Sequence, residues 1–165
     1  MRFRPTEIDL TRWRIILAIP FVIATLPAFG QLPNPALTPG VVRTSRAAEI
    51  CAPSFRTKRF RHTTKQMKRQ VCAEYGFTSK QCPKQGVMEL DHLLPLELGG
   101  ADDIHNLWPE LAQYPDGSPG FHIKDELENV LKNKVCEGEM MLPDAQTCIM
   151  ADWINCYERV FGKKP

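Results

Sequence analysis

The sequence predicts an α+β fold in which a β-hairpin is followed by a helix, with further helices flanking this core and disulfides stabilising it. Three observations lead to this prediction. Two short apolar stretches flank a Gly-Gly turn at residues 99–100, which is typical of a hairpin. From Ile123 onward, apolar residues recur every three to four positions, as in amphipathic helices. The chain also has six cysteines in 165 residues, which favours disulfides in a small exported protein.

The first thirty residues have the layout of a secretory signal or an N-terminal anchor. Four arginines precede an uncharged apolar run at residues 15–26, and small residues, Ala28 and Gly30, end the segment. The run is shorter than the roughly 20 residues of a membrane span, and Pro20 interrupts it. We therefore expect a periplasmic or secreted protein, or a membrane-anchored one if residues 1–30 are retained. Residues 31–48 are proline-rich at their start and lack an apolar face, so we expect a flexible linker before a domain at 49–165.

The first elements of that domain follow from local signals. Thr63 or Thr64 can cap a helix that runs to about Glu74. The apolar stretch Val87–Leu94 predicts a strand. Residues Ile104–Trp108 predict the returning strand, which Pro109 would end.

We expect residues 110–121 to form a loop, because they are rich in Pro and Gly. An amphipathic helix should then run from Ile123 to Gly138, and a second one from Pro143 to about Phe161. If these two helices are antiparallel, Cys136 and Cys148 come together, and this is the disulfide pair that we predict from the residues alone.

Charge is unevenly distributed along the chain. The net charge is only +2, but residues 1–90 hold 15 Lys/Arg against 5 Asp/Glu, and residues 91–165 hold 6 against 14. A dense basic run at 56–69 favours contact with phosphates, although a solvated helix would have the same composition. The candidate nucleic-acid-binding residues are Arg56, Lys58, Arg59, Arg61, Lys65, Lys68 and Arg69.

Polar residues that suit phosphodiester hydrolysis accompany the hairpin. A divalent cation stabilises the charge that develops during this reaction, and a neutral imidazole accepts a proton from water near pH 7. We therefore assign Asp91 and His122 as ligands of one metal ion and His92 as the general base, with Asn106 orienting the imidazole of His92. Adjacent residues of a regular strand point to opposite faces, so Asp91 and His92 can share a site only where the strand ends or bulges.

This pattern resembles the HNH endonucleases, also called ββα-metal or His-Me finger nucleases. The resemblance rests on Asp91-His92 and on the stretches PLELGG at 95–100, NLWP at 106–109, HIKD at 122–125 and LENVLKNKVCEG at 127–138. It implies that residues 49–165 are an HNH nuclease domain with a ββα-metal core.

The resemblance also implies the reaction. We expect hydrolysis of DNA, with RNA as the alternative, that leaves a 5′-phosphate and requires one divalent metal ion. Mg²⁺ is the first expectation for this ion, and Mn²⁺, Ni²⁺ and Zn²⁺ are alternatives. Because phosphate contacts carry no direct sequence information, we expect little sequence preference.

Other interpretations remain open at this point. The chain could be a non-catalytic exported module that binds nucleic acid or a protein partner on an HNH scaffold. It could also be a toxin, which would need an inhibitor protein as a partner. His105 and Glu126 are alternative metal ligands. We expect a monomer in each case.

Overall fold

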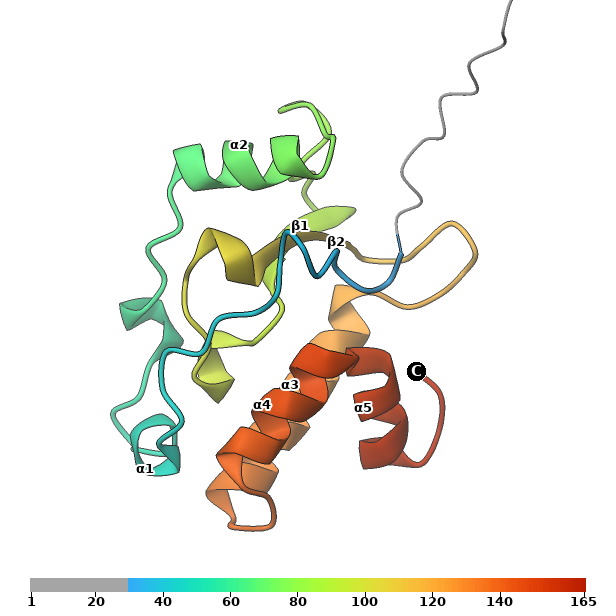
Figure 1. Ribbon diagram of the computed structural model, residues 1–165. Helices are drawn as coiled ribbons and strands as arrows, with labels where there is room; N and C mark the ends of the chain where they lie inside the picture. Colours follow the sequence, from blue (N-terminus) through green and yellow to red (C-terminus); the bar gives the residue numbers. More distant parts are fainter. Residues whose placement is uncertain (1–29) are drawn as a thin grey trace, which may run out of the picture.

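The computed structural model describes residues 30–165, so nearly all of the segment expected to be a signal or an anchor lies outside the described residues. A two-stranded hairpin lies at the centre, with helix α2 (Lys65–Glu74) on one side and helices α3 (Phe121–Cys136), α4 (Leu142–Ala151) and α5 (Trp153–Phe161) on the other (Figure 1). The predicted α+β class is confirmed. Within the described part of the chain, no helix has the length and apolar character to cross a membrane.

The hairpin consists of β1 (Met88–His92) and β2 (Leu107–Leu111), which pair antiparallel with Asp91 opposite Trp108. The returning strand was predicted at Ile104–Trp108, and it begins three residues later. The Asp103 side chain accepts the N–H of His105, and this bond caps a 3₁₀ turn over the first residues of the predicted strand. Pro109 lies inside β2 rather than ending it, because both strands of a two-stranded sheet are edge strands.

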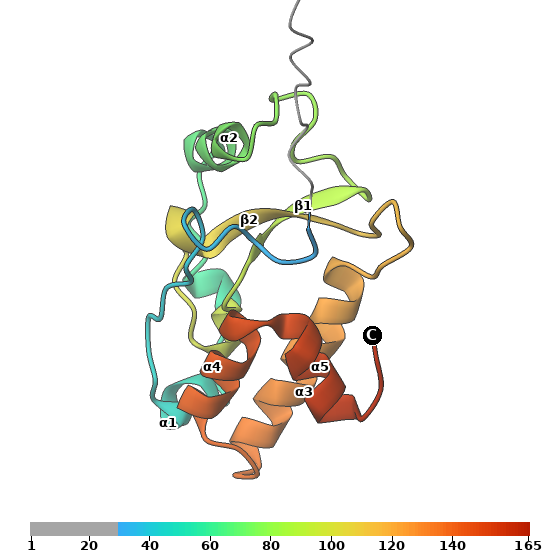
Figure 2. The same ribbon diagram turned by 45° about the vertical axis from the view of Figure 1, so that its right-hand side comes forward.

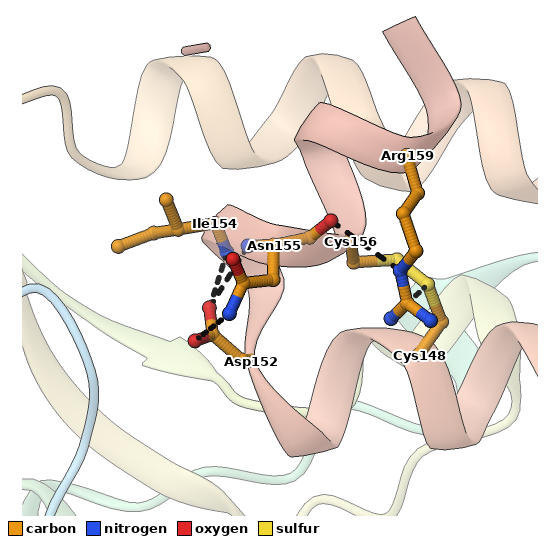
Figure 3. Close-up of a disulfide and its surroundings, with 6 residues drawn as sticks. All are labelled: Cys148, Asp152, Ile154, Asn155, Cys156 and Arg159. Atoms are coloured by element: carbon orange, nitrogen blue, oxygen red, sulfur yellow. Dashed lines mark hydrogen bonds between the residues drawn. A yellow bond between two sulfur atoms is a disulfide. The ribbon is translucent and has the colours of Figure 1, made fainter. Parts of the chain in front are cut away.

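Two of the three predicted helices are found close to their predicted bounds, α2 and α3, and the third is split. Thr64 caps α2 by accepting the N–H of Met67 at 3.1 Å, as expected. The predicted single helix from Pro143 to Phe161 is instead two helices, α4 and α5, which meet at Asp152. Asp152 has an extended backbone, and its carboxylate accepts the N–H groups of Ile154 and Asn155 (Figure 3). The side chain therefore caps a new helix where periodicity alone predicts a continuous one.

All six cysteines form disulfides: Cys51–Cys136, Cys72–Cys82 and Cys148–Cys156. The prediction of disulfides is confirmed, but the predicted pair Cys136–Cys148 was wrong. The break at Asp152 turns α5 back along α4 and brings Cys156 to Cys148 (Figure 3). Cys136, at the end of α3, instead bonds to Cys51 at the end of the short helix α1 (Ala47–Ile50).

Residues 31–48, which we expected to be a flexible linker, are packed against the rest of the domain. Val42 forms an isolated β-bridge with Gly100. The Thr38 hydroxyl donates to the Leu107 carbonyl at 2.9 Å, and the Trp153 indole donates to the Gln31 carbonyl at 2.8 Å. The segment has little regular structure, so periodicity gave no sign of these contacts. Figure 2 shows it crossing the hairpin before it reaches α1.

The main core lies between the helices and the loop that follows β1. Two leucines of this loop, Leu94 and Leu98, are fully buried among apolar residues of α3, α4 and α5. The core residues contributed by these helices include Leu127, Leu131, Leu142, Ile149, Trp153 and Tyr157. Burial of these two leucines therefore fixes the loop after β1. Because the loop continues directly from β1, it also fixes the end of that strand.

Gly100 provides a test of how tightly this loop is held. A Cβ atom on Gly100 would lie 1.9 Å from the Leu94 carbonyl oxygen, so a side chain there requires the backbone to move. We predict that Gly100→Ala lowers the free energy of unfolding by at least about 2 kcal/mol. Gly138→Ala is the control, because that site is open but has a φ of +79°, and it should cost about 1 kcal/mol. Urea unfolding with intact disulfides measures both, and equal costs would contradict the packing described.

Candidate active site

Two of the four residues predicted to carry chemistry, Asp91 and His92, line a pocket of about 240 Å³ at the end of β1. Asp91 and His92 line it from the strand, and Arg61 reaches it from the basic segment. The remaining lining residues are Thr57, Pro95, Leu96, Glu97, Asp125, Glu128 and Asn129. A larger pocket of about 410 Å³ lies beside Tyr75 and Trp108, but it contains none of the predicted catalytic or metal-binding residues.

His92 is buried, and its imidazole is held by Asp102 rather than by Asn106. Nε2 of His92 lies 2.8 Å from Oδ1 of Asp102. If Nε2 donates this hydrogen bond, Nδ1 is the basic nitrogen of the neutral ring. Within residues 30–165, Nδ1 has no hydrogen-bond partner. Burial lowers the pKa of His92, while the bond to Asp102 opposes that shift, so the neutral ring is favoured near pH 7.

Asp102 connects the general-base candidate to the basic segment. Its Oδ1 also accepts the Thr63 hydroxyl at 2.5 Å, and its Oδ2 accepts the backbone N–H of His62. These two residues directly precede α2. In the sequence, Asp102 and Asp103 form a pair shortly after Gly-Gly, as turn residues commonly do. Only the fold distinguishes the buried Asp102 from Asp103, whose carboxylate pairs with the exposed His105.

Asn106 has a structural role that the sequence did not indicate. Its amide oxygen accepts the N–H groups of Leu94 and Val41, and its amide nitrogen donates to the carbonyls of Leu94 and Ala101. All of these partners are backbone groups. The side chain thus closes the loop between the strands and holds it against the segment at residue 41, which leaves Asp102 to orient His92.

Asp91 is hydrogen-bonded through both carboxylate oxygens. Oδ1 accepts the backbone N–H of His92 at 2.8 Å, and Oδ2 accepts from the ammonium of Lys124 at 2.6 Å. Burial would raise the pKa of Asp91, but the charge of Lys124 and hydrogen bonds outweigh burial and hold it below the usual value. Asp91 is therefore ionised at neutral pH.

Two further carboxyl groups surround Lys124. Glu128 accepts from its ammonium at 2.6 Å, and burial raises the pKa of Glu128 to about 8 against the opposing effect of that ammonium. Glu110 is fully buried 3.9 Å from the ammonium, and burial raises its pKa well above the usual value. Sequence reasoning assigned no role to Glu128 or to Lys124.

His122, the expected second metal ligand, does not line the pocket. It is exposed at the start of α3, and its ring centroid lies 4.3 Å from that of Phe121. The alternative ligands His105 and Glu126 are also exposed and outside the pocket. Helix α3 instead presents Asp125, Glu128 and Asn129, whose three- and four-residue spacing places them on one face.

The pocket's donors suit a hard cation. Its lining includes the carboxylates of Asp91, Asp125 and Glu128 and the amide of Asn129, and the Lys124 ammonium already lies 2.6 Å from one oxygen each of Asp91 and Glu128. His92 is the only imidazole among the lining residues, and no thiolate is present. This chemistry fits Mg²⁺ or Mn²⁺ better than Zn²⁺. Within residues 30–165, no three His, Cys, Asp or Glu side chains are already arranged as a metal site.

The seven predicted phosphate-binding residues are all exposed. Within the part of the chain that the structure describes, none of them forms an ion pair with a carboxylate, so their charges are available to a polyanion. The segment around them is anchored by stacking of Phe55 on Phe60, with the Arg43 guanidinium 3.8 Å from the Phe60 ring centroid. Arg61 follows this anchor directly and lines the pocket.

The hydrogen bond between His92 and Asp102 predicts a change in titration. Asp102 raises the pKa of His92, so Asp102→Asn should lower that pKa further by removing the negative charge. Asp103→Asn is the matched control, because Asp103 pairs with His105 and does not contact His92. NMR titration of the imidazole protons measures both variants. An unchanged or higher pKa of His92 in Asp102→Asn would contradict the arrangement.

Comparison with known proteins identifies no relative of this chain. No family model matches the sequence, and no curated protein or solved structure matches it either.

Proposed function

We propose that the protein is an exported, divalent-metal-dependent nuclease of the HNH type that hydrolyses phosphodiester bonds, with DNA as its substrate. The observation that carries the proposal is the pocket itself. A buried imidazole held by a carboxylate lines the pocket together with the ionised Asp91 and with Arg61, which has no carboxylate partner among residues 30–165. The Asp-His pair and the stretches that resemble HNH endonucleases support the same interpretation.

His92 is the general base in this proposal. Asp102 accepts from Nε2 and leaves Nδ1 free to take a proton from a water molecule in the pocket. Burial keeps the ring neutral near pH 7, which a base requires. Asp102 would also stabilise the imidazolium that forms once the proton is taken.

Asp91 is the primary metal ligand in this proposal, and Asn129 and Glu128 are its partners in place of His122. Glu128 would have to lose its proton to bind the ion, because burial raises its pKa to about 8. A metal ion bound there would stabilise negative charge on the phosphate and on the leaving oxygen. Arg61 would bind a phosphate of the substrate at the mouth of the pocket. The exposed cations of α2 and the segment before it would contact neighbouring phosphates, with little sequence preference.

Plasmid nicking by the exported, oxidised protein tests the proposal. We predict cleavage with Mg²⁺ or Mn²⁺ that EDTA abolishes, and a fall of about 10²–10⁴-fold in turnover for His92→Ala through loss of the base. His105→Ala is the matched control, because His105 belongs to the same loop but is exposed and outside the pocket. It should retain wild-type turnover, and so should His122→Ala.

Absence of cleavage under every divalent metal, with DNA binding retained, would favour the non-catalytic binding module instead. Loss of turnover in His122→Ala together with weakened metal binding would restore His122 as a ligand. Either result would overturn the corresponding part of the proposal.

A further inference from the structure

Lys124 uses all of its hydrogen-bonding capacity inside the protein. An ammonium group has three N–H donors. In Lys124 they meet Asp91 Oδ2 at 2.6 Å, the His92 carbonyl at 2.9 Å and Glu128 Oε1 at 2.6 Å. The side chain is 0% exposed, which is rare for lysine. Lys124 therefore has neither a free donor nor a surface with which to contact a substrate.

We propose that Lys124 is a positioning residue that sets Asp91 and His92 for the reaction. This inference rests on the proposed nuclease function. Lys124 acts through three groups that line the pocket or belong to residues that line it: the Asp91 carboxylate, the His92 main chain and the Glu128 carboxylate.

The need for such a residue follows from strand geometry. Asp91 and His92 are consecutive in β1, so a regular strand would direct their side chains to opposite faces. One ammonium bonds to the side chain of Asp91 and to the main chain of His92, at the last residue of the strand. Lys124 and Glu128 both belong to α3, four residues apart, so it is the bonds from Lys124 to Asp91 and to the His92 carbonyl that join the strand end to the helix face lining the pocket.

A purely structural role would use the same contacts. A buried ion pair that only joins α3 to β1 would affect stability when broken, while the remaining folded molecules would turn over normally. A positioning role predicts that folded molecules turn over slowly although DNA binding is intact, because the cations proposed to contact phosphates lie on other elements. The two roles are separated by kcat and KM measured on folded protein.

The experiment compares Lys124→Met with Lys134→Met in the full-length oxidised chain. Lys134 is on the same helix and pairs with Glu139 at 2.9 Å, but this pair is partly exposed and remote from the pocket. After circular dichroism and disulfide mapping verify the fold, plasmid nicking is measured. We expect kcat of Lys124→Met to fall by about 10²-fold, as misplaced groups cause, with an unchanged KM for DNA. Lys134→Met should match the wild type.

A folded Lys124→Met protein with wild-type kcat would overturn the inference, as would a change in KM alone.

A second measurement uses the wild-type protein and needs no variant. The Lys124 ammonium should give a ¹H–¹⁵N NMR signal that survives at neutral pH because exchange with water is blocked, whereas the signal of Lys134 should be lost. Rapid exchange at Lys124 would refute the arrangement of three bonds.

The same NMR sample separates this inference from the proposed function. Substoichiometric Mn²⁺ bound at Asp91 should broaden the Lys124 signal, because Nζ lies 2.6 Å from the carboxylate. A protected signal that Mn²⁺ leaves sharp would contradict metal binding at Asp91, while it would support the positioning contacts of Lys124.

Discussion

The end of β1 at His92 is the constraint on which the rest of the site depends. Two neighbouring residues serve one pocket there only because several side chains hold the chain as it leaves the strand. Asn106 fixes the backbone of Leu94, and Lys124 bonds to the His92 carbonyl and the Asp91 carboxylate. Burial of Leu94 and Leu98 in the helical core completes the restraint. Asp91 and His92 are therefore positioned by hydrogen bonds and by packing that involve residues outside the pocket.

Electrostatics then give neighbouring groups different roles. Burial penalises every charge in the site, but the compensation differs from residue to residue. The Lys124 ammonium keeps Asp91 ionised, while burial prevails at His92 and Glu110 and favours their neutral forms. An ionised carboxylate beside a neutral imidazole is the pair that a metal-dependent hydrolase needs near pH 7. The fold therefore keeps Asp91 ionised and His92 neutral although both side chains are largely shielded from bulk water.

Local signals in the sequence predicted much of the fold. The helix capped by Thr64, the hairpin and the helix after residue 120 all follow from caps, turns and periodicity, which act over a few residues. Asp152 defeated the periodicity because one capping side chain was enough to start a new helix. That break also brings Cys156 to Cys148, while Cys136 pairs with Cys51 in a segment that periodicity did not connect to it.

The site was only partly predictable for a related reason. Asp91 and His92 stood out as polar residues in an apolar strand, and the structure places both in one pocket. Asp102, Lys124 and Glu128 look like ordinary surface residues in the sequence, and their roles come from long-range packing that no local pattern encodes. His122 and Asn106 illustrate the opposite case. Their residue types suited the chemistry, but the fold exposes His122 and directs Asn106 to backbone groups.

The tautomer of His92 tests the central claim most directly, because the base must have Nδ1 free and Nε2 bonded to Asp102. Two-bond ¹H–¹⁵N correlation spectra of the oxidised wild-type protein at pH 7 report which ring nitrogen is protonated. If His92 is the base, the ring is neutral at this pH and carries its proton on Nε2. A ring protonated on Nδ1, or a doubly protonated imidazolium at this pH, would contradict the assignment of His92 as the general base.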